Sequence, residues 1–239
     1  MKLDALFFSA HPDDIELSCG GTVVKLVKMG KKIGVIDLTQ GELGTRGSKE
    51  IRQKELKNAS KIMGIQAREN LNLKDGNIEE NFKNKLKVIS IIRHYKPEIV
   101  FLPYYKDRHP DHIHASNLVK ESSFYSGLRK INTKRSKQSQ AAYRPKKCIF
   151  YMQTYTFEPS FIIDITAEFE TKMKAVKCYS SQFYNPRSKE PATFISEKKF
   201  LEYLEARARF YGFQIGTKYG EPYFVEEKLK LNSENLFGP

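Results

Sequence analysis

Two short segments, far apart in the sequence, concentrate the residue types of a hydrolytic metal site. The first is AHPDD at residues 10–14, and the second is RHPDH at residues 108–112. Together they contain three aspartates and three of the five histidines of the chain. Histidine nitrogens and carboxylate oxygens are common zinc ligands in hydrolases, which keep one coordination position for water. The two segments therefore supply enough ligands for one metal ion and leave acid and base groups beside it.

Three of these side chains form the predicted ligand set. His11 and Asp14 are close enough in a tight turn to bind one ion, and His112 supplies a third ligand. The metal would polarise a carbonyl group and lower the pKa of a water molecule toward ~7. Asp13 is left beside the ion as a general base for the attacking water. The alternative for the two aspartates is structural, because carboxylates are also favoured at the start of a helix.

His109 and Asp111 form a second pair in the second segment. A histidine that is held by a carboxylate can stay protonated, and it can then stabilise an oxyanion or protonate a leaving amine. The remaining histidines, His94 and His114, are expected at a helix end and on a helix face. Neither is assigned to the site.

Each segment follows a short apolar run that predicts a buried strand. Along the chain, such runs alternate with runs of helical periodicity. This alternation predicts an α/β fold with a Rossmann-like, doubly wound, mostly parallel sheet of order 3-2-1-4-5 and helices on both faces. The predicted strands lie at 3–9, 32–39, 70–73, 98–102, 147–153 and 161–165, and the predicted helices at 15–29, 50–63, 82–95, 112–127, 167–179 and 197–213.

The predicted strand order brings the two segments together. The first and fourth strands are neighbours in such a sheet, and the direction of winding reverses between them. Ligands of doubly wound sheets bind in the crevice at this position. We therefore expect one site between the two segments. Because neither a repeat nor a linker stands out, a single domain is expected over residues 1–239.

The composition excludes some other classes of protein. No apolar run is long enough for a membrane span, and no signal peptide is expected, so we expect a cytoplasmic protein. The three cysteines, Cys19, Cys148 and Cys178, have no CxxC spacing and are expected to be reduced. A disulfide or a thiolate zinc site is the less favoured alternative for them.

The net charge of the chain is +13. Its basic residues are spread along the sequence, with one concentration at residues 128–147. This segment holds eight lysines and arginines and no acid, and is expected to be a surface loop or a mobile excursion. No nucleic-acid motif or series of stacking aromatic residues accompanies it, so no nucleic-acid partner is expected. A basic scaffold or nucleic-acid-binding protein is the non-enzymatic alternative, but it would not need the acid, base and ligand set.

At these residues the chain resembles the LmbE-like, or PIG-L-like, family of zinc de-N-acetylases. The matching pieces are AHPDD at 10–14, CGGT at 19–22 and HPDH at 109–112. Further pieces resemble the bacillithiol-biosynthesis branch of the family, namely DLTQGELGTRG at 37–47, NLxLxDG at 70–76, FEPSFIIDIT at 157–166, YxSQF at 179–183 and EARARFYG at 205–212. The resemblance thus covers nearly the whole chain.

The resemblance implies a reaction, a cofactor and a set of roles. The family removes the N-acetyl group from N-acetylglucosamine conjugates, and the branch would convert N-acetylglucosaminyl-malate to glucosaminyl-malate and acetate. One zinc ion per chain is implied, on the three ligands named above, with Asp13 as the base. His109 corresponds to a charged electrophile that Asp111 orients. Another N-acetylglucosamine conjugate, or a chitooligosaccharide, is the alternative substrate.

The resemblance also implies substrate contacts. Arg52 matches a substrate-contacting arginine, and Arg108 and Arg46 are candidate partners for the malate carboxylates, because arginine offers a bidentate fork. The alternative for these two is a surface or loop-fixing role. Phe200 stands where some relatives carry a tyrosine near the oxyanion. The expected partner is thus a small anionic sugar conjugate, and a homo-oligomer, a hexamer in related enzymes, is a further expectation.

Overall fold

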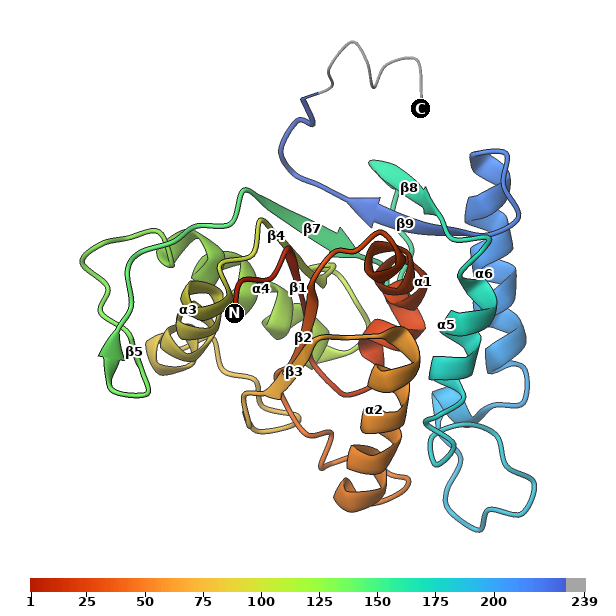
Figure 1. Ribbon diagram of the computed structural model, residues 1–239. Coiled ribbons are helices and arrows are strands. Elements are labelled where there is room, and N and C mark those ends of the chain that lie inside the picture. Colours follow the sequence, from red (N-terminus) through yellow and green to blue (C-terminus); the bar gives the residue numbers. More distant parts are fainter. Residues whose placement is uncertain (231–239) are drawn as a thin grey trace.

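A seven-stranded, mostly parallel sheet forms the centre of the protein (Figure 1). The computed structural model describes residues 1–230, so residues 231–239 of the predicted domain lie outside the described residues. In chain order the strands are β1 (Ala5–Ser9), β2 (Ile33–Asp37), β3 (Ala67–Asn70), β4 (Ile99–Pro103), β7 (Lys147–Tyr151), β8 (Phe161–Asp164) and β9 (Gly220–Phe224). Their order across the sheet is β3-β2-β1-β4-β7-β9-β8.

The strand order confirms the predicted fold class and differs from the prediction in detail. The strands from β3 to β7 are parallel and follow the predicted order 3-2-1-4-5. Beyond β7 the sheet becomes antiparallel, because β9 pairs antiparallel with both β7 and β8. Strand β9 was not predicted, because its sequence GEPYF begins with residues that are depleted in strands. Pairing with two neighbours holds it in place.

Both faces of the central strands are buried, as expected of a parallel sheet that helices cover. Successive side chains of a strand point to opposite faces. Phe7 accordingly packs in one core cluster, where its ring stacks on Phe101 at 4.1 Å between centroids. Phe8 packs in the second cluster together with Leu102. The sheet is therefore anchored from both sides next to the ends of β1 and β4.

The helices form a layer on each face of the sheet (Figure 1). On one face α1 (Asp14–Lys28), α2 (Lys49–Met63) and α5 (Phe169–Val176) pack together, and on the other face α3 (Phe82–Tyr95) packs on α4 (Pro110–Tyr125). The last helix, α6 (Phe200–Gln214), packs against β9 and follows a short 3₁₀ turn, η1 (Phe194–Ser196). Among the helices of residues 1–230, none has the length and apolar character needed to cross a bilayer.

The third strand lies earlier in the chain than predicted. Leu71 and Leu73 suggested a strand at 70–73, but β3 ends at Asn70. The chain then turns, with Asn72 in the left-handed region at φ 49°. Leu73 is nevertheless buried in the second core cluster. The apolar residues here belong to a loop that packs on the core. A buried strand would have the same apolar pattern, so the sequence alone did not distinguish the two.

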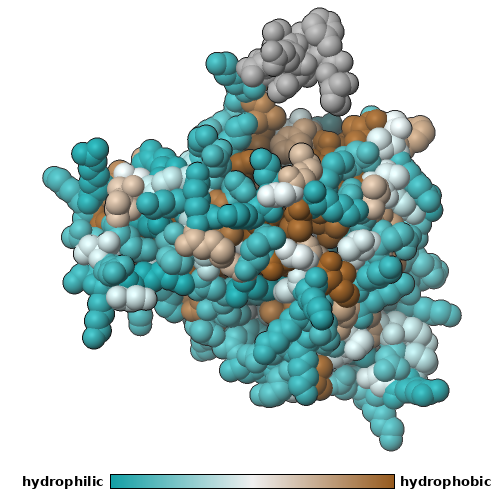
Figure 2. Space-filling view, in the orientation of Figure 1, coloured by the Kyte–Doolittle hydropathy of each residue, from teal (hydrophilic) through white to brown (hydrophobic). Residues whose placement is uncertain are grey.

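The basic segment at 128–147 contains a short hairpin in place of the predicted loop or mobile excursion. Its strands are β5 (Lys134–Arg135) and β6 (Gln138–Ser139). Arg135 binds both carboxylate oxygens of Glu69, at 2.8 and 2.9 Å, and Arg93 donates to the carbonyl of Ile131 at 2.6 Å. These bonds attach the segment to β3 and α3. The surface where the hairpin lies, at the left of Figure 2, is mostly hydrophilic.

Candidate active site

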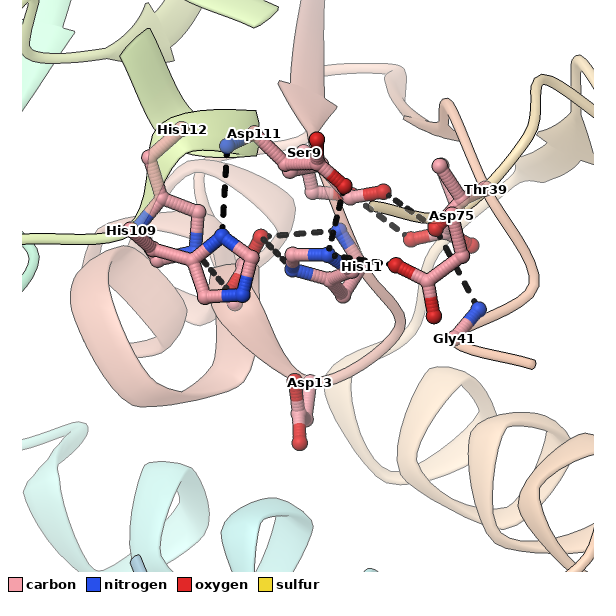
Figure 3. Close-up of polar contacts among 12 residues, drawn as sticks. Ser9, His11, Asp13, Thr39, Gly41, Asp75, His109, Asp111 and His112 are labelled. Atoms are coloured by element: carbon pink, nitrogen blue, oxygen red, sulfur yellow. Dashed lines mark hydrogen bonds and ion pairs between the residues drawn. The ribbon is translucent and has the colours of Figure 1, made fainter. Parts of the chain in front are cut away.

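The two sequence segments meet at the carboxyl ends of β1 and β4, as predicted (Figure 3). His11 follows β1, Asp14 begins α1, and His112 lies in the first turn of α4. One ligand atom from each of these three residues lies within 4.8 Å of the other two. All three side chains are buried. The parallel pairing of β1 with β4 therefore assembles the predicted ligand set from residues that are distant in sequence.

The predicted ligands face one another with complementary charge. Oδ1 of Asp14 lies 3.4 Å from Nε2 of His112, and Oδ2 lies 3.7 Å from Nδ1 of His11. Burial raises the pKa of Asp14, but the two histidines outweigh this effect and hold the pKa well below its usual range. Two imidazoles and one carboxylate are a donor set that suits zinc and leaves coordination open. The residues present therefore fit the metal that the sequence predicts.

Asp107, which the sequence analysis missed, orients one of these ligands. Its Oδ1 lies 2.9 Å from Nδ1 of His112, so that Nε2 of this imidazole faces Asp14. Its Oδ2 accepts hydrogen bonds from the backbone N–H groups of Thr154 and Tyr155, at 2.9 and 3.2 Å. Burial lowers the pKa of His112, but Asp14 and Asp107 together raise it to about 9. A carboxylate directly before RHPDH was the available signal, since metal-binding histidines commonly donate to such a group.

Two further carboxylates hold His11 from its other side. Oδ1 of Asp75 lies 3.1 Å and Oδ2 of Asp111 lies 3.4 Å from Nε2 of His11. Burial lowers the pKa of His11, but the bonds to these two carboxylates raise it to about 10. Asp75 was quoted from the sequence only within the motif NLxLxDG at 70–76 and was given no role. It is buried, and it also accepts from the N–H of Leu43 at 2.8 Å.

The expected carboxylate–imidazole pair between Asp111 and His109 is not formed. The carboxylate of Asp111 instead accepts from the N–H of Gly76 at 2.7 Å, besides facing His11. The backbone N–H of Asp111 donates to Nδ1 of His109 at 3.2 Å, because His109 is the N-cap of α4. A neutral His109 therefore carries its proton on Nε2. Partial burial and the neighbouring imidazoles, His11 among them, lower the pKa of His109, which favours this neutral form over the expected charged one.

The ligand atoms of His11, His109 and Asp111 form a second close group, also within 4.8 Å of one another. In this group Nδ1 of His109 and the carboxylate of Asp111 already bind backbone N–H groups. In the group of His11, Asp14 and His112, only Oδ2 of Asp14 accepts a backbone bond, from the N–H of His11 at 2.9 Å, and Oδ1 faces His112. Both oxygens of Asp111 are occupied by backbone N–H groups, so the group with Asp14 is the better candidate for the metal site.

Asp13 lies to one side of the histidine cluster (Figure 3) in a backbone conformation that is rare for a side-chain-bearing residue. Its φ and ψ are 105° and −27°, in the left-handed region, where strain is expected. It is the N-cap residue of α1, but its side chain makes no capping hydrogen bond, so this carboxylate does not have the capping role of the structural alternative. Burial, with Asp14 adding to it, raises the pKa of Asp13 to about 7 although Arg52 opposes the shift.

A cavity of about 510 Å³ opens over the cluster. The predicted ligands, Asp13 and His109 all line it. Its remaining wall includes the loop 43–45 and apolar side chains of η1 and α6, among them Phe194, Phe200 and Tyr203. Phe200 lies at the wall and brings no hydroxyl group there. The cavity thus has a polar end with the predicted metal ligands and a wall rich in aromatic rings.

The three candidate arginines lie in different places. Arg52 lines the cavity and binds the carbonyl of Gly41 and, at 2.5 Å, the side chain of Gln182, with the carboxylate of Asp13 3.8 Å away. Arg108 also lines the cavity, with its guanidinium over the ring of Phe194 at 4.5 Å. Arg46 is buried and donates to the carbonyl of Ser181 at 3.1 Å. It is not part of the cavity wall, and its contacts are those of the loop-fixing alternative.

Comparison with known proteins relates this chain to deacetylases. The family described as PIG-L, GlcNAc-PI de-N-acetylase, matches residues 6–123, a range that contains both sequence segments. Among solved structures, a conserved protein of Thermus thermophilus is 34% identical, with a TM-score of 0.86, and the match covers 97% of this chain and 98% of that one. This match extends the likeness beyond the family range to nearly the whole chain.

Two curated relatives carry functional names. The diacetylchitobiose deacetylase of Thermococcus kodakarensis is 29% identical over 228 residues, which are 90% of this chain and 80% of the relative. A probable N-acetyl-alpha-D-glucosaminyl L-malate deacetylase 2 of Bacillus cereus is 24% identical over 196 residues, which are 76% of this chain and 84% of the relative. The chain therefore belongs to the PIG-L family of de-N-acetylases, as its motifs predict, and is an enzyme of the deacetylase class.

Proposed function

We propose that this enzyme is a zinc-dependent hydrolase that removes the N-acetyl group from an N-acetylglucosamine conjugate. The observation that carries the proposal is the placement of Asp13 and His109 beside the group of His11, Asp14 and His112, in one cavity. Both curated relatives are named as deacetylases of N-acetylglucosamine-containing compounds, which supports the substrate class. Amide hydrolysis needs an activated water molecule and a stabilised oxyanion, and this group of residues can supply both.

The metal would be held by His11, Asp14 and His112. When bound, zinc would polarise the acetyl carbonyl group and acidify a water molecule. Asp107 and the pair of Asp75 and Asp111 would keep the two imidazoles in the tautomers that present a free nitrogen to the ion.

The chain's own acid and base groups would then move the protons. Asp13 takes a proton from the water molecule while the water oxygen attacks the acetyl carbonyl carbon. His109 donates a hydrogen bond from Nε2 to the developing oxyanion, since its Nδ1 is already occupied. The C–N bond then breaks, and the proton held by Asp13 passes to the leaving nitrogen. The products are acetate and the free amine of the glucosamine conjugate.

Within this class we propose N-acetylglucosaminyl-malate as the substrate, giving glucosaminyl-malate and acetate. Arg108 supports this choice, because it lines the cavity and makes no ion pair with a carboxylate of residues 1–230. It could bind a substrate carboxylate. The Bacillus cereus relative is named for this reaction.

A chito-oligosaccharide is the second candidate. The Thermococcus kodakarensis relative, at 29% identity, is named for diacetylchitobiose and is the more similar of the two. The aromatic side chains of the cavity wall could accept the apolar face of a second sugar ring.

A substrate panel separates these candidates. Acetate release would be measured on N-acetylglucosaminyl-malate, diacetylchitobiose and N-acetylglucosamine with the zinc-loaded enzyme. We expect the highest kcat/KM on the malate conjugate. A clear preference for diacetylchitobiose would reject the malate assignment and keep the deacetylase, while no release from any of the three would reject the substrate class.

A further inference from the structure

Helix α1, which begins at the ligand Asp14, is interrupted one turn later. Cys19 has φ −132° and ψ 21°, which are not helical, so the helix consists of two parts joined by a kink. In a continuous helix the N–H groups of Gly21 and Thr22 would bond to carbonyl groups four residues earlier. Here they donate to the carboxylate of Glu221 on β9, at 2.9 and 2.7 Å. The carbonyl groups of Leu17 and Ser18 are thereby left without their helical partners.

Side chains from two other helices bind these freed carbonyl groups. Lys172 of α5, which also pairs with Glu221 at 2.7 Å, donates to the carbonyl of Ser18 at 3.4 Å. Arg207 of α6 donates to the carbonyl of Leu17 at 3.0 Å and to the carbonyl of Gln153 after β7. Buried backbone groups that lose a partner are costly, so the kink depends on these side chains.

Leu17 links this arrangement to the proposed base. Its N–H group donates to the carbonyl of Asp13 at 3.0 Å, while its own carbonyl accepts from Arg207. Asp13 is the residue with the strained left-handed backbone. Such a conformation persists only where the surrounding bonds hold it. Leu17 is the helix residue whose N–H group binds Asp13. By binding the carbonyl of Leu17, Arg207 therefore holds this residue in place.

Arg207 also belongs to the helix that forms part of the cavity wall. Arg207 lines the cavity together with Phe200 and Tyr203 of α6, and its guanidinium lies over the ring of Tyr203 at 5.7 Å. We propose that Arg207 is a positioning residue of the deacetylation reaction, which ties the α6 wall to the first turn of α1 and so keeps Asp13 in place. This role rests on the proposed function of Asp13 as the base.

The test compares Arg207→Met with Arg209→Met, a matched control on the same helix. Arg209 is exposed and bonds to Glu205 at 2.7 Å, away from the kink. Amide hydrogen exchange would be measured on residues 14–18 in the metal-free proteins. Loss of one hydrogen bond of ordinary net strength should accelerate exchange there roughly tenfold in Arg207→Met relative to the control. Amide exchange in β1 and β4 should stay close to the wild-type rate in both variants.

Steady-state kinetics on the best substrate of the wild-type enzyme give the second readout. We expect kcat to fall about tenfold in Arg207→Met, with KM within about threefold of the wild-type value. Although Arg207 lines the cavity, its guanidinium is bound by the carbonyl groups of Leu17 and Gln153, so its loss should displace the base more than it weakens substrate binding. Arg207→Lys retains one hydrogen-bond donor and should recover part of kcat. If the methionine variant does not fold, the lysine variant tests the positioning role of Arg207. Unchanged exchange at 14–18, or a raised KM with unchanged kcat, would overturn the proposal.

The two arms separate this proposal from the proposed function. If the wild-type protein releases no acetate from any conjugate, the deacetylase assignment fails. Faster exchange at residues 14–18 would still support the tie between Arg207 and Leu17. Exchange equal to that of the control, in an active enzyme, contradicts only the role of Arg207.

Discussion

The metal end of the cavity and its aromatic wall differ in whether their polar side chains already have hydrogen-bond or ion-pair partners in the protein. At the metal end, His11 and His112 are each held by a carboxylate on the side away from Asp14. On the wall, Arg108 lies over Phe194 and makes no ion pair with a carboxylate of residues 1–230. The held imidazoles of His11 and His112 are fixed for one kind of chemistry. Arg108 is free to bind a group of the substrate, so this side chain can decide which substrate is accepted. The two ends should therefore respond differently to substitution.

The largest effect is expected from Asp13→Ala at the metal end. Removal of a general base should lower kcat by about 100- to 10,000-fold, because no other carboxylate occupies its position. Zinc content, measured after dialysis, should stay near that of the wild-type protein, since Asp13 is not in the predicted ligand set. Full turnover in this variant would reject the assignment of the base.

Asp107→Asn should weaken metal binding without removing a ligand. The neutral amide accepts the Nδ1 proton of His112 more weakly than the carboxylate, and it has only one acceptor oxygen where Asp107 uses two, so zinc affinity should fall about 10- to 100-fold. Competition with a chelator of known affinity measures this change. Glu80→Gln, which removes a carboxylate from the exposed His114 at 2.9 Å, is the matched control and should leave zinc affinity unchanged. Equal effects of the two substitutions would contradict the orienting role.

Arg108→Met tests the wall. If Arg108 binds a substrate carboxylate, KM for N-acetylglucosaminyl-malate should rise about tenfold, and kcat should change little. KM for a neutral conjugate should stay within about twofold of the wild-type value, because no carboxylate is present to lose. A similar rise of KM on both substrates would instead assign Arg108 to packing on Phe194.

The smallest catalytic effect is expected from Arg46→Met. Its hydrogen bond to Ser181 contributes to stability and lies outside the cavity wall. The free energy of unfolding should fall by ~1 kcal/mol in denaturant titration, with kcat/KM unchanged on every substrate. A selective loss of activity on the malate conjugate would place Arg46 back among the substrate contacts.

The sequence predicted the fold class and the meeting of the two segments, because both follow from local patterns. AHPDD stands directly after an apolar run and RHPDH a few residues after another, and alternating runs predict parallel strands whose carboxyl ends meet. The partners of the ligands were harder to predict. Asp107 and Asp75 act on His112 and His11 through contacts that depend on how two loops fold back, which no local pattern describes.

Other errors arose where tertiary contacts override local preference. β9 forms from a sequence with glycine and proline because its neighbours on both sides pair with it. The kink in α1 likewise has no clear signal in the periodicity of residues 15–29. It requires Glu221, Lys172 and Arg207, which lie far along the chain.

Metal-dependent acetate release tests the central claim most directly. The purified protein would be stripped of metal with a chelator, assayed on N-acetylglucosaminyl-malate and diacetylchitobiose, and assayed again after addition of one equivalent of zinc. We expect no acetate above background from the stripped enzyme, and restored release on at least one of the two substrates with zinc. Release that is unaffected by stripping, or no release with zinc bound, would contradict a zinc-dependent deacetylase at this site.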